Sequence, residues 1–148
     1  MTLDRDQQER AWILQLVQEF QEIVPYYRIS LSQPFIRISE SRTQFGSWQH
    51  YTRTLTISRF LIEDHRWDVV LEIFKHELAH MWVSERGLDA EDDPHGLVFQ
   101  EACRRLGVAP WARTATVEID PNTARSQHRH LSEDKERQVR RVEKLLSL

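Results

Sequence analysis

The 148-residue sequence predicts a single α+β domain in which helices pack on a small sheet. Apolar residues recur at helical spacing in residues 4–24 and again in residues 67–86, and each run is long enough for an amphipathic helix. Between these runs, short segments alternate apolar and polar residues as half-buried strands do. A chain of this length, with 40% apolar residues and five tryptophans, is large enough for one hydrophobic core.

The N-terminal part is expected to form one helix and three strands. The helix covers residues 4–24, and Pro25 ends it, because proline disfavours helical backbone in the residue before it. Strands are expected over residues 33–39, 47–51 and 54–58, and together they suggest a small three-stranded antiparallel sheet. One strand, residues 47–51, is expected to lie at an edge of that sheet.

The central helix is expected over residues 67–86, with Asp68 as its N-cap and Gly87 as a left-handed stop. His76 and His80 fall beside its apolar arc, which predicts a buried helix with a polar edge. The apolar arc consists of Val70, Leu71, Phe74, Leu78, Met81 and Trp82.

A further helix is expected after an acidic loop over residues 88–93. Asp93 can cap this helix with Pro94 at its first position, and Gly107 ends it after Leu106. Packing of this helix on the central one turns its N-terminus toward the histidine edge. The residues expected to make that contact are Phe99, Ala102 and Leu106.

The segment His76-Glu77-Leu78-Ala79-His80 has the spacing of a metal site on a helix. Residues four apart differ by roughly 40° around the helix axis, so both imidazoles can face one ion. The carboxylate of Glu77 then lies beside the metal, where it can act as a base on a water molecule. A catalytic zinc needs three protein ligands and an open fourth position, so a third ligand is required.

Several residues are candidates for that third ligand. His95 follows His80 after fourteen residues and starts the next helix, so His95 is the first candidate. Glu101 lies on the same helix as His95 but six residues further on, which places it on nearly the opposite face, so only one of the two can bind. The carboxylates of Glu91, Asp92 and Asp93 are further candidates, although a loop holds a ligand less rigidly.

Composition limits the class of protein. No apolar run is long enough to span a bilayer, the residues after Met1 are charged rather than signal-like, and Cys103 is the only cysteine. A single cysteine suits a reducing compartment, so we expect a cytoplasmic protein. Residues 125–148 hold seven Lys or Arg against four Asp or Glu, whereas residues 1–124 hold thirteen against nineteen.

The histidine segment, together with His95-Gly96-Leu97-Val98-Phe99, resembles the two-part motif of the SprT-like family of zinc metallopeptidases. Residues 46–51 and 54–62 are also similar to the family's strands and its Ile-x-Leu-Ser-x-x-Leu passage, so the resemblance covers roughly residues 35–106. It implies a zincin-like fold with one Zn²⁺ held by His76, His80 and His95, and with Glu77 as catalytic base. The family's C-terminal zinc ribbon needs paired cysteines, which this chain lacks.

The resemblance also implies two kinds of function. The first is a metalloendopeptidase acting on a protein or peptide, as the related Spartan proteases act in DNA–protein crosslink repair. The second is a DNA-associated or transcription-elongation module that binds zinc without proteolysis. Tyr51 matches a family tyrosine and is either a stabiliser of the oxyanion or an ordinary edge-strand residue.

The expected organisation is a SprT-like domain over residues 1–120 and a polar linker with a basic amphipathic helix over residues 121–148. The basic residues of that last segment are either a solvated face or a low-affinity DNA contact. Its helix either docks on the domain or opens a further domain. An edge strand over residues 47–51 either pairs with an extended substrate or is blunted by its own polar side chains. The sequence does not indicate an oligomeric state.

Overall fold

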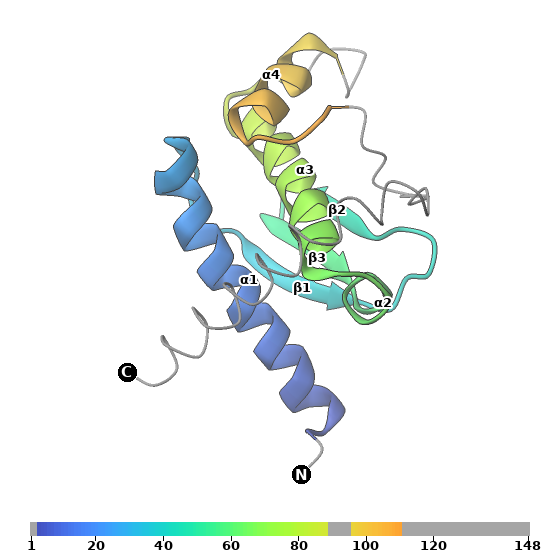
Figure 1. Cartoon of the computed structure of the whole chain (residues 1–148). Coiled ribbons are helices and arrows are strands. Elements are labelled where there is room, and N and C mark those ends of the chain that lie inside the picture. The colour runs from blue at the N-terminus through green and yellow to red at the C-terminus, as the bar shows by residue number, and fades with distance from the viewer. Residues whose placement is uncertain (1–2, 89–95, 111–148) are drawn as a thin grey trace, which may run out of the picture.

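The computed structural model describes residues 3–88 and 96–110, and it confirms the α+β class (Figure 1). The predicted segment 121–148 lies outside these residues. Within them, no helix is long and apolar enough to cross a membrane. The elements in chain order are α1 (Arg5–Tyr27), β1 (Phe35–Ser39), β2 (Gly46–Gln49), β3 (Thr54–Ser58), α2 (Arg59–Asp64), α3 (Trp67–Glu85) and α4 (Leu97–Arg105).

Helix α1 begins at a capping box and runs further than predicted. Asp4 accepts a hydrogen bond from the backbone N–H of Gln7, whose side chain accepts one from the backbone N–H of Asp4. The prediction that Pro25 ends the helix is wrong, because α1 continues to Tyr27. Pro25 lies in the last turn of α1, where its missing N–H removes at most one helical hydrogen bond. Arg28 is the C-cap and has the left-handed conformation (φ 53°).

The sheet has the strand order β1-β3-β2, with β3 in the centre. The antiparallel prediction is correct for β2 with β3 and wrong for β1, which pairs with β3 in parallel. The reason is that the connection over residues 40–45 passes the end of β3. Ser58 at that end donates from its backbone N–H to the carbonyl of Phe45 and from its hydroxyl to the carbonyl of Ser41 (2.9 and 2.5 Å). Strand β2 is an edge strand, as expected for this region.

Helix α3 is the central element of the core, and most of its side chains are buried. It packs on the sheet, while α4 lies beside its C-terminal half (Figure 1). Two polar contacts join α1 to α3. The Trp67 indole donates to Glu19 (3.2 Å), and the Lys75 ammonium donates to the Tyr27 hydroxyl (2.8 Å).

The ends of α3 and α4 agree only in part with the sequence prediction. Asp68 is not the N-cap of α3, because Arg66 takes that position and Asp68 pairs with it from the first turn (3.6 Å). Gly87 and Gly107 both have positive φ (67° and 70°), as expected for glycines that follow helices. The predicted start of α4 at Asp93 and Pro94 is wrong, because α4 begins at Leu97 and Gly96, with extended backbone, is its N-cap.

Candidate metal centre

His76 and His80 lie one turn apart on α3 and face α4. The Phe99 ring of α4 stacks on the His80 ring, with centroids 4.3 Å apart, and lies 5.9 Å from the His76 ring. His76 is 1% exposed, His80 is half-buried, and Phe99 is 2% exposed. The structure therefore brings the two predicted ligands together, on the side of α3 that the start of α4 covers.

A second contact from α4 orients His76. Its Nδ1 lies 3.9 Å from the Sγ of Cys103, a buried thiol whose pKa burial raises to about 12. Histidines that bind metals usually donate their other ring N–H to an outer partner, which fixes the tautomer and the ring orientation. A neutral thiol can accept such a bond weakly, and in the tautomer with the proton on Nδ1 the lone pair of His76 is on Nε2.

Glu77 is buried beside the histidine pair. Its side chain is 3% exposed, and burial raises the pKa of its carboxyl to about 8. The side chain lies against the start of β2, where Gly46 has no side chain to exclude it. A carboxylate whose pKa is raised is a stronger base, which is the property required of a residue that takes a proton from water.

The donor set suits zinc, although the described residues do not show a third ligand beside the histidine pair. Within residues 3–88 and 96–110, no three His, Cys, Asp or Glu side chains group in a way that could hold a metal. His95 and the acidic-loop candidates at 91–93 lie outside those ranges. Two imidazoles four apart on a helix, with a carboxylate between them, are typical of zinc sites that use Glu as the base.

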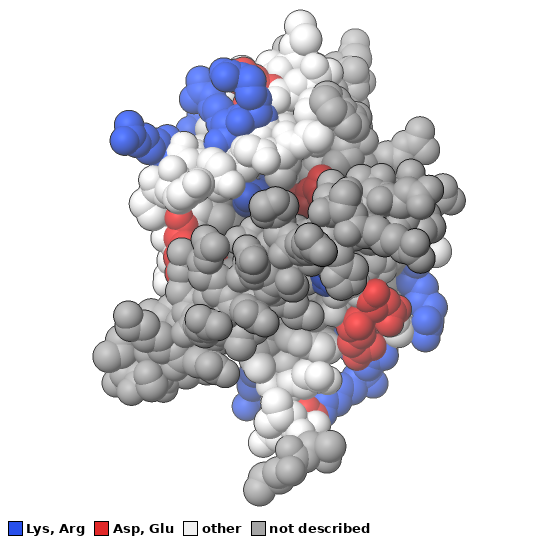
Figure 2. Space-filling model, in the orientation of Figure 1, with Lys and Arg blue, Asp and Glu red and all other residues white. Residues whose placement is uncertain are grey.

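The alternative ligand Glu101 is engaged elsewhere. Its carboxylate accepts hydrogen bonds from Arg104 (2.8 and 2.6 Å) and Arg105 (3.2 Å), and these bonds lower its pKa to about 2. Figure 2 shows basic side chains gathered over α4 at the top of the visible face. A Glu101 that moved to a metal would have to give up both arginine contacts.

Tyr51 lies in the turn after β2. Its side chain is 93% exposed, and its ring packs edge-on against His50 with centroids 5.8 Å apart. The oxyanion role of Tyr51 therefore stays a prediction, and a substrate or a movement of the turn would have to bring the phenol to the reacting carbonyl.

The model of the SprT-like family matches residues 11–124, which include the histidine pair, Glu77 and His95. This chain belongs to the SprT-like family. The resemblance inferred from the motif is thus confirmed over a longer stretch than the motif itself covers. No curated protein matches the chain significantly. Among solved structures, the metallopeptidase zymogen jannalysin of Methanocaldococcus jannaschii is similar with 18% identity and a TM-score of 0.48, over 80% of this chain and 95% of jannalysin.

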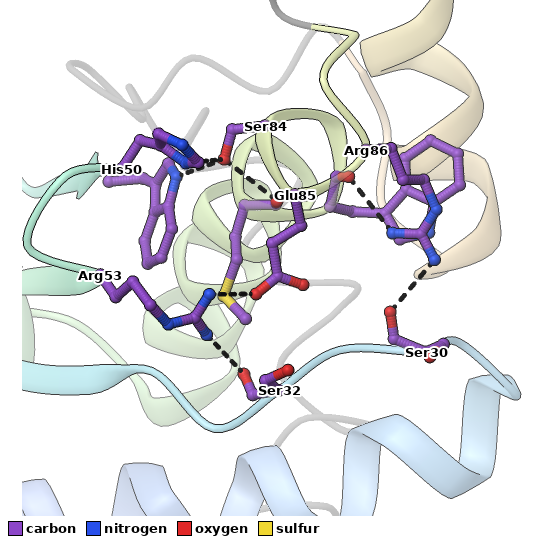
Figure 3. A network of polar contacts seen from close by, with 10 residues as sticks. Ser30, Ser32, His50, Arg53, Ser84, Glu85 and Arg86 are labelled. Carbon is purple, nitrogen blue, oxygen red and sulfur yellow. Dashed lines mark hydrogen bonds and ion pairs between the residues drawn. The ribbon is translucent and has the colours of Figure 1, made fainter.

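A polar network anchors the β2–β3 hairpin of this SprT-like domain to the end of α3 (Figure 3). The Trp48 indole N–H donates to the Ser84 hydroxyl (2.8 Å), which lies 3.2 Å from Nδ1 of His50 and itself donates to the carbonyl of Met81 (3.2 Å). Since Ser84 is one turn beyond His80, the network fixes the edge strand relative to the helix that carries the candidate ligands.

Two arginines extend this network to the segment between α1 and β1. Arg53 pairs with Glu85 (2.5 Å) and donates to the carbonyl of Ser32 (3.4 Å), while Arg86 donates to the carbonyl of Ser30 (3.2 Å). Sequence reasoning missed these residues, along with the roles of Gly46 and Cys103. The one local signal for this network is the spacing of Ser84, which follows His80 by four residues and therefore lies on the same side of the helix.

Proposed function

We propose that this SprT-like protein is a zinc-dependent endopeptidase in which His76, His80 and His95 hold one zinc ion and Glu77 is the general base. The supporting observation is that both imidazoles and the buried carboxyl lie on one helix, with Phe99 of α4 stacked on the His80 ring and 5.9 Å from the His76 ring. When bound, the zinc would act as a Lewis acid and lower the pKa of a water molecule.

His95 is favoured as the third ligand because of its place in the chain. It is bonded to Gly96, the N-cap of α4, and precedes Phe99 by four residues. Four residues of extended chain span at most about 14 Å, and Phe99 already contacts both histidine rings. The competing Glu101 is held by two arginines, as described above.

Glu77 performs the proton transfers in this proposal. Its carboxylate accepts a proton from the attacking water and then donates it to the nitrogen of the departing amine, so that one group serves both halves of the hydrolysis. Burial supports this role, because the pKa of about 8 lies close to neutral pH, where a group can both accept and donate protons.

The edge strand β2 supports an extended peptide as substrate. A strand that pairs on one side only can add a peptide strand through main-chain hydrogen bonds. The Trp48–Ser84 bond holds β2 beside α3, so a peptide bound along β2 would lie near Glu77. The finer prediction for the substrate is a protein bound to DNA. It rests on the resemblance to the Spartan proteases, and the basic residues within 125–148 would supply a DNA contact.

The proposal is tested by measuring zinc content and cleavage of an unfolded protein substrate by the full chain and its variants. The variant Glu77→Gln should keep its zinc and lose cleavage, because the amide is isosteric but is not a base. The variant His95→Ala should lose zinc affinity, whereas the matched control Glu101→Gln should keep it. Undiminished cleavage by Glu77→Gln would refute the mechanism.

Assays on the same purified protein distinguish the two functions that the family resemblance suggests. Zinc-loaded wild type that binds DNA in a salt-dependent way and cleaves nothing would favour the non-proteolytic module. Loss of that DNA affinity on removal of residues 125–148 would assign the contact to the basic segment. Zinc affinity that falls in Glu101→Gln and not in His95→Ala would reassign the third ligand.

A further inference from the structure

Gly46 opens β2 at the point where Glu77 of α3 lies against the sheet. A Cβ atom at position 46 would lie 3.1 Å from Cγ and 3.2 Å from Oε1 of Glu77, and 2.9 Å from Cγ2 of Ile73. Ordinary van der Waals contact between carbon atoms begins at roughly 3.5 Å. A side chain at position 46 would therefore force Ile73 or Glu77 to shift.

The surroundings leave little freedom for a side chain at position 46. Ile73 is 1% exposed and β-branched, so its methyl group is held in one χ1 rotamer by the helix. Gly46 itself pairs with Ile57 of the central strand. Two residues further on, the indole of Trp48 is bonded to Ser84 at 2.8 Å, so β2 is tied to α3 as well.

Of the two groups that face Gly46, the Glu77 side chain is the one that can be displaced. The contact with Ile73 is the shorter one, but Ile73 is β-branched and held in one rotamer, whereas Glu77 has more rotatable bonds and can give way. A side chain at position 46 would thus press on the carboxyl from the sheet side, while the strand stays anchored through Trp48.

We propose that Gly46 is a positioning residue for the general base. Because Gly46 has no side chain, the Glu77 carboxyl can lie between α3 and the edge strand. The inference rests on the proposed function, because it adds to Glu77 a second residue that sets where the base lies. The three atoms nearest to a Cβ at position 46 belong to Ile73 and Glu77 and to neither histidine, so we expect zinc binding not to depend on Gly46.

The test uses Gly46→Ala, Ile73→Leu and the double variant Gly46→Ala/Ile73→Leu in the full chain. Leucine has no methyl group on Cβ and nearly the volume of isoleucine, so Ile73→Leu removes the 2.9 Å contact and keeps the core filled. The double variant should recover the thermal stability that Gly46→Ala loses. Its zinc affinity should equal that of the wild type, while kcat stays lower by about 10- to 100-fold with KM unchanged, as for a misplaced catalytic group.

Three results would overturn the inference. Recovery of kcat together with stability in the double variant would make Gly46 a core-packing residue only. A raised KM with normal kcat would show that the strand moved instead of the base. Loss of zinc from the double variant would show that the histidines, and not Glu77, respond to the substitution.

A thermodynamic cycle separates failure of this inference from failure of the proposed function. The loss of unfolding free energy caused by Gly46→Ala should be smaller in a Glu77→Ala background, which removes Cγ and the carboxyl. An equal loss in both backgrounds would overturn the contact. A smaller loss together with no cleavage by zinc-loaded wild type would support the contact and refute the peptidase function.

Discussion

The bond between Trp48 and Ser84 gives a prediction that can be worked from the structure. Ser84→Ala removes the acceptor of the indole N–H (2.8 Å) and the hydroxyl contact with His50 (3.2 Å). A buried donor left without an acceptor costs about 1–3 kcal/mol, and Trp48 is only half-buried, so the lower part of that range applies. Alanine is the better helix former and offsets about 0.5 kcal/mol. We expect a net loss of about 1 kcal/mol.

The assay is thermal unfolding followed by circular dichroism, with Trp48→Phe as the matched background. For a chain of 148 residues, a loss of about 1 kcal/mol lowers Tm by about 2–4 °C. In the Trp48→Phe background, which has no indole N–H, Ser84→Ala should cost much less. An equal loss in both backgrounds would refute the reasoning, because the free energy would then come from packing of Ser84 and not from the hydrogen bond.

Three further predictions concern other parts of the chain. Gly107→Ala should lower Tm more than Gly87→Ala. Both glycines have positive φ, but only at position 107 would a Cβ meet a tyrosine ring, at 2.9 Å. Equal losses of Tm in the two variants would contradict this prediction. Cys103→Ala should weaken zinc binding by about tenfold in a chelator competition, because it removes the partner of His76 at Nδ1. Cys103→Ser should restore part of that affinity. Unchanged zinc affinity in both variants would show that Cys103 is not part of the site. Burial raises the pKa of Glu72, so the folded state favours the protonated carboxyl and loses that stabilisation as pH rises through the folded pKa. Glu72→Gln should therefore be more stable than the wild type in urea at neutral pH. It should show no such gain at about pH 3.

Local patterns predicted α1, α3, most of α4 and the histidine pair, because these depend on residues close together in the sequence, whereas the short helix α2 was not predicted. The long apolar arc placed α3 almost to its ends, and the spacing of His76 and His80 needed only the geometry of one helix. The left-handed glycines after α3 and α4 were predicted for the same reason.

Features that depend on distant residues were not predicted. Whether β1 pairs with β2 or with β3 depends on the path of the connection past Ser58, and the alternation of apolar residues is the same for parallel and antiparallel pairs. Gly46 and Cys103 have no local motif either, since each acquires its role from a side chain about 30 residues away. Propensity also failed at Pro25, where packing of Tyr27 on the core favours one more helical turn.

The burial of α3 has a consequence for how this protein could be controlled. Amide hydrogens in a helix enclosed on most sides exchange with solvent only when the whole domain unfolds, whereas exposed turns open at much lower free energy. Deuterium should therefore enter the helix of His76 and His80 last and the β2–β3 turn early. A conformational change at the histidine pair would then come from movement of the hairpin or of α4 against α3, because melting the central helix would cost the entire stability of the fold.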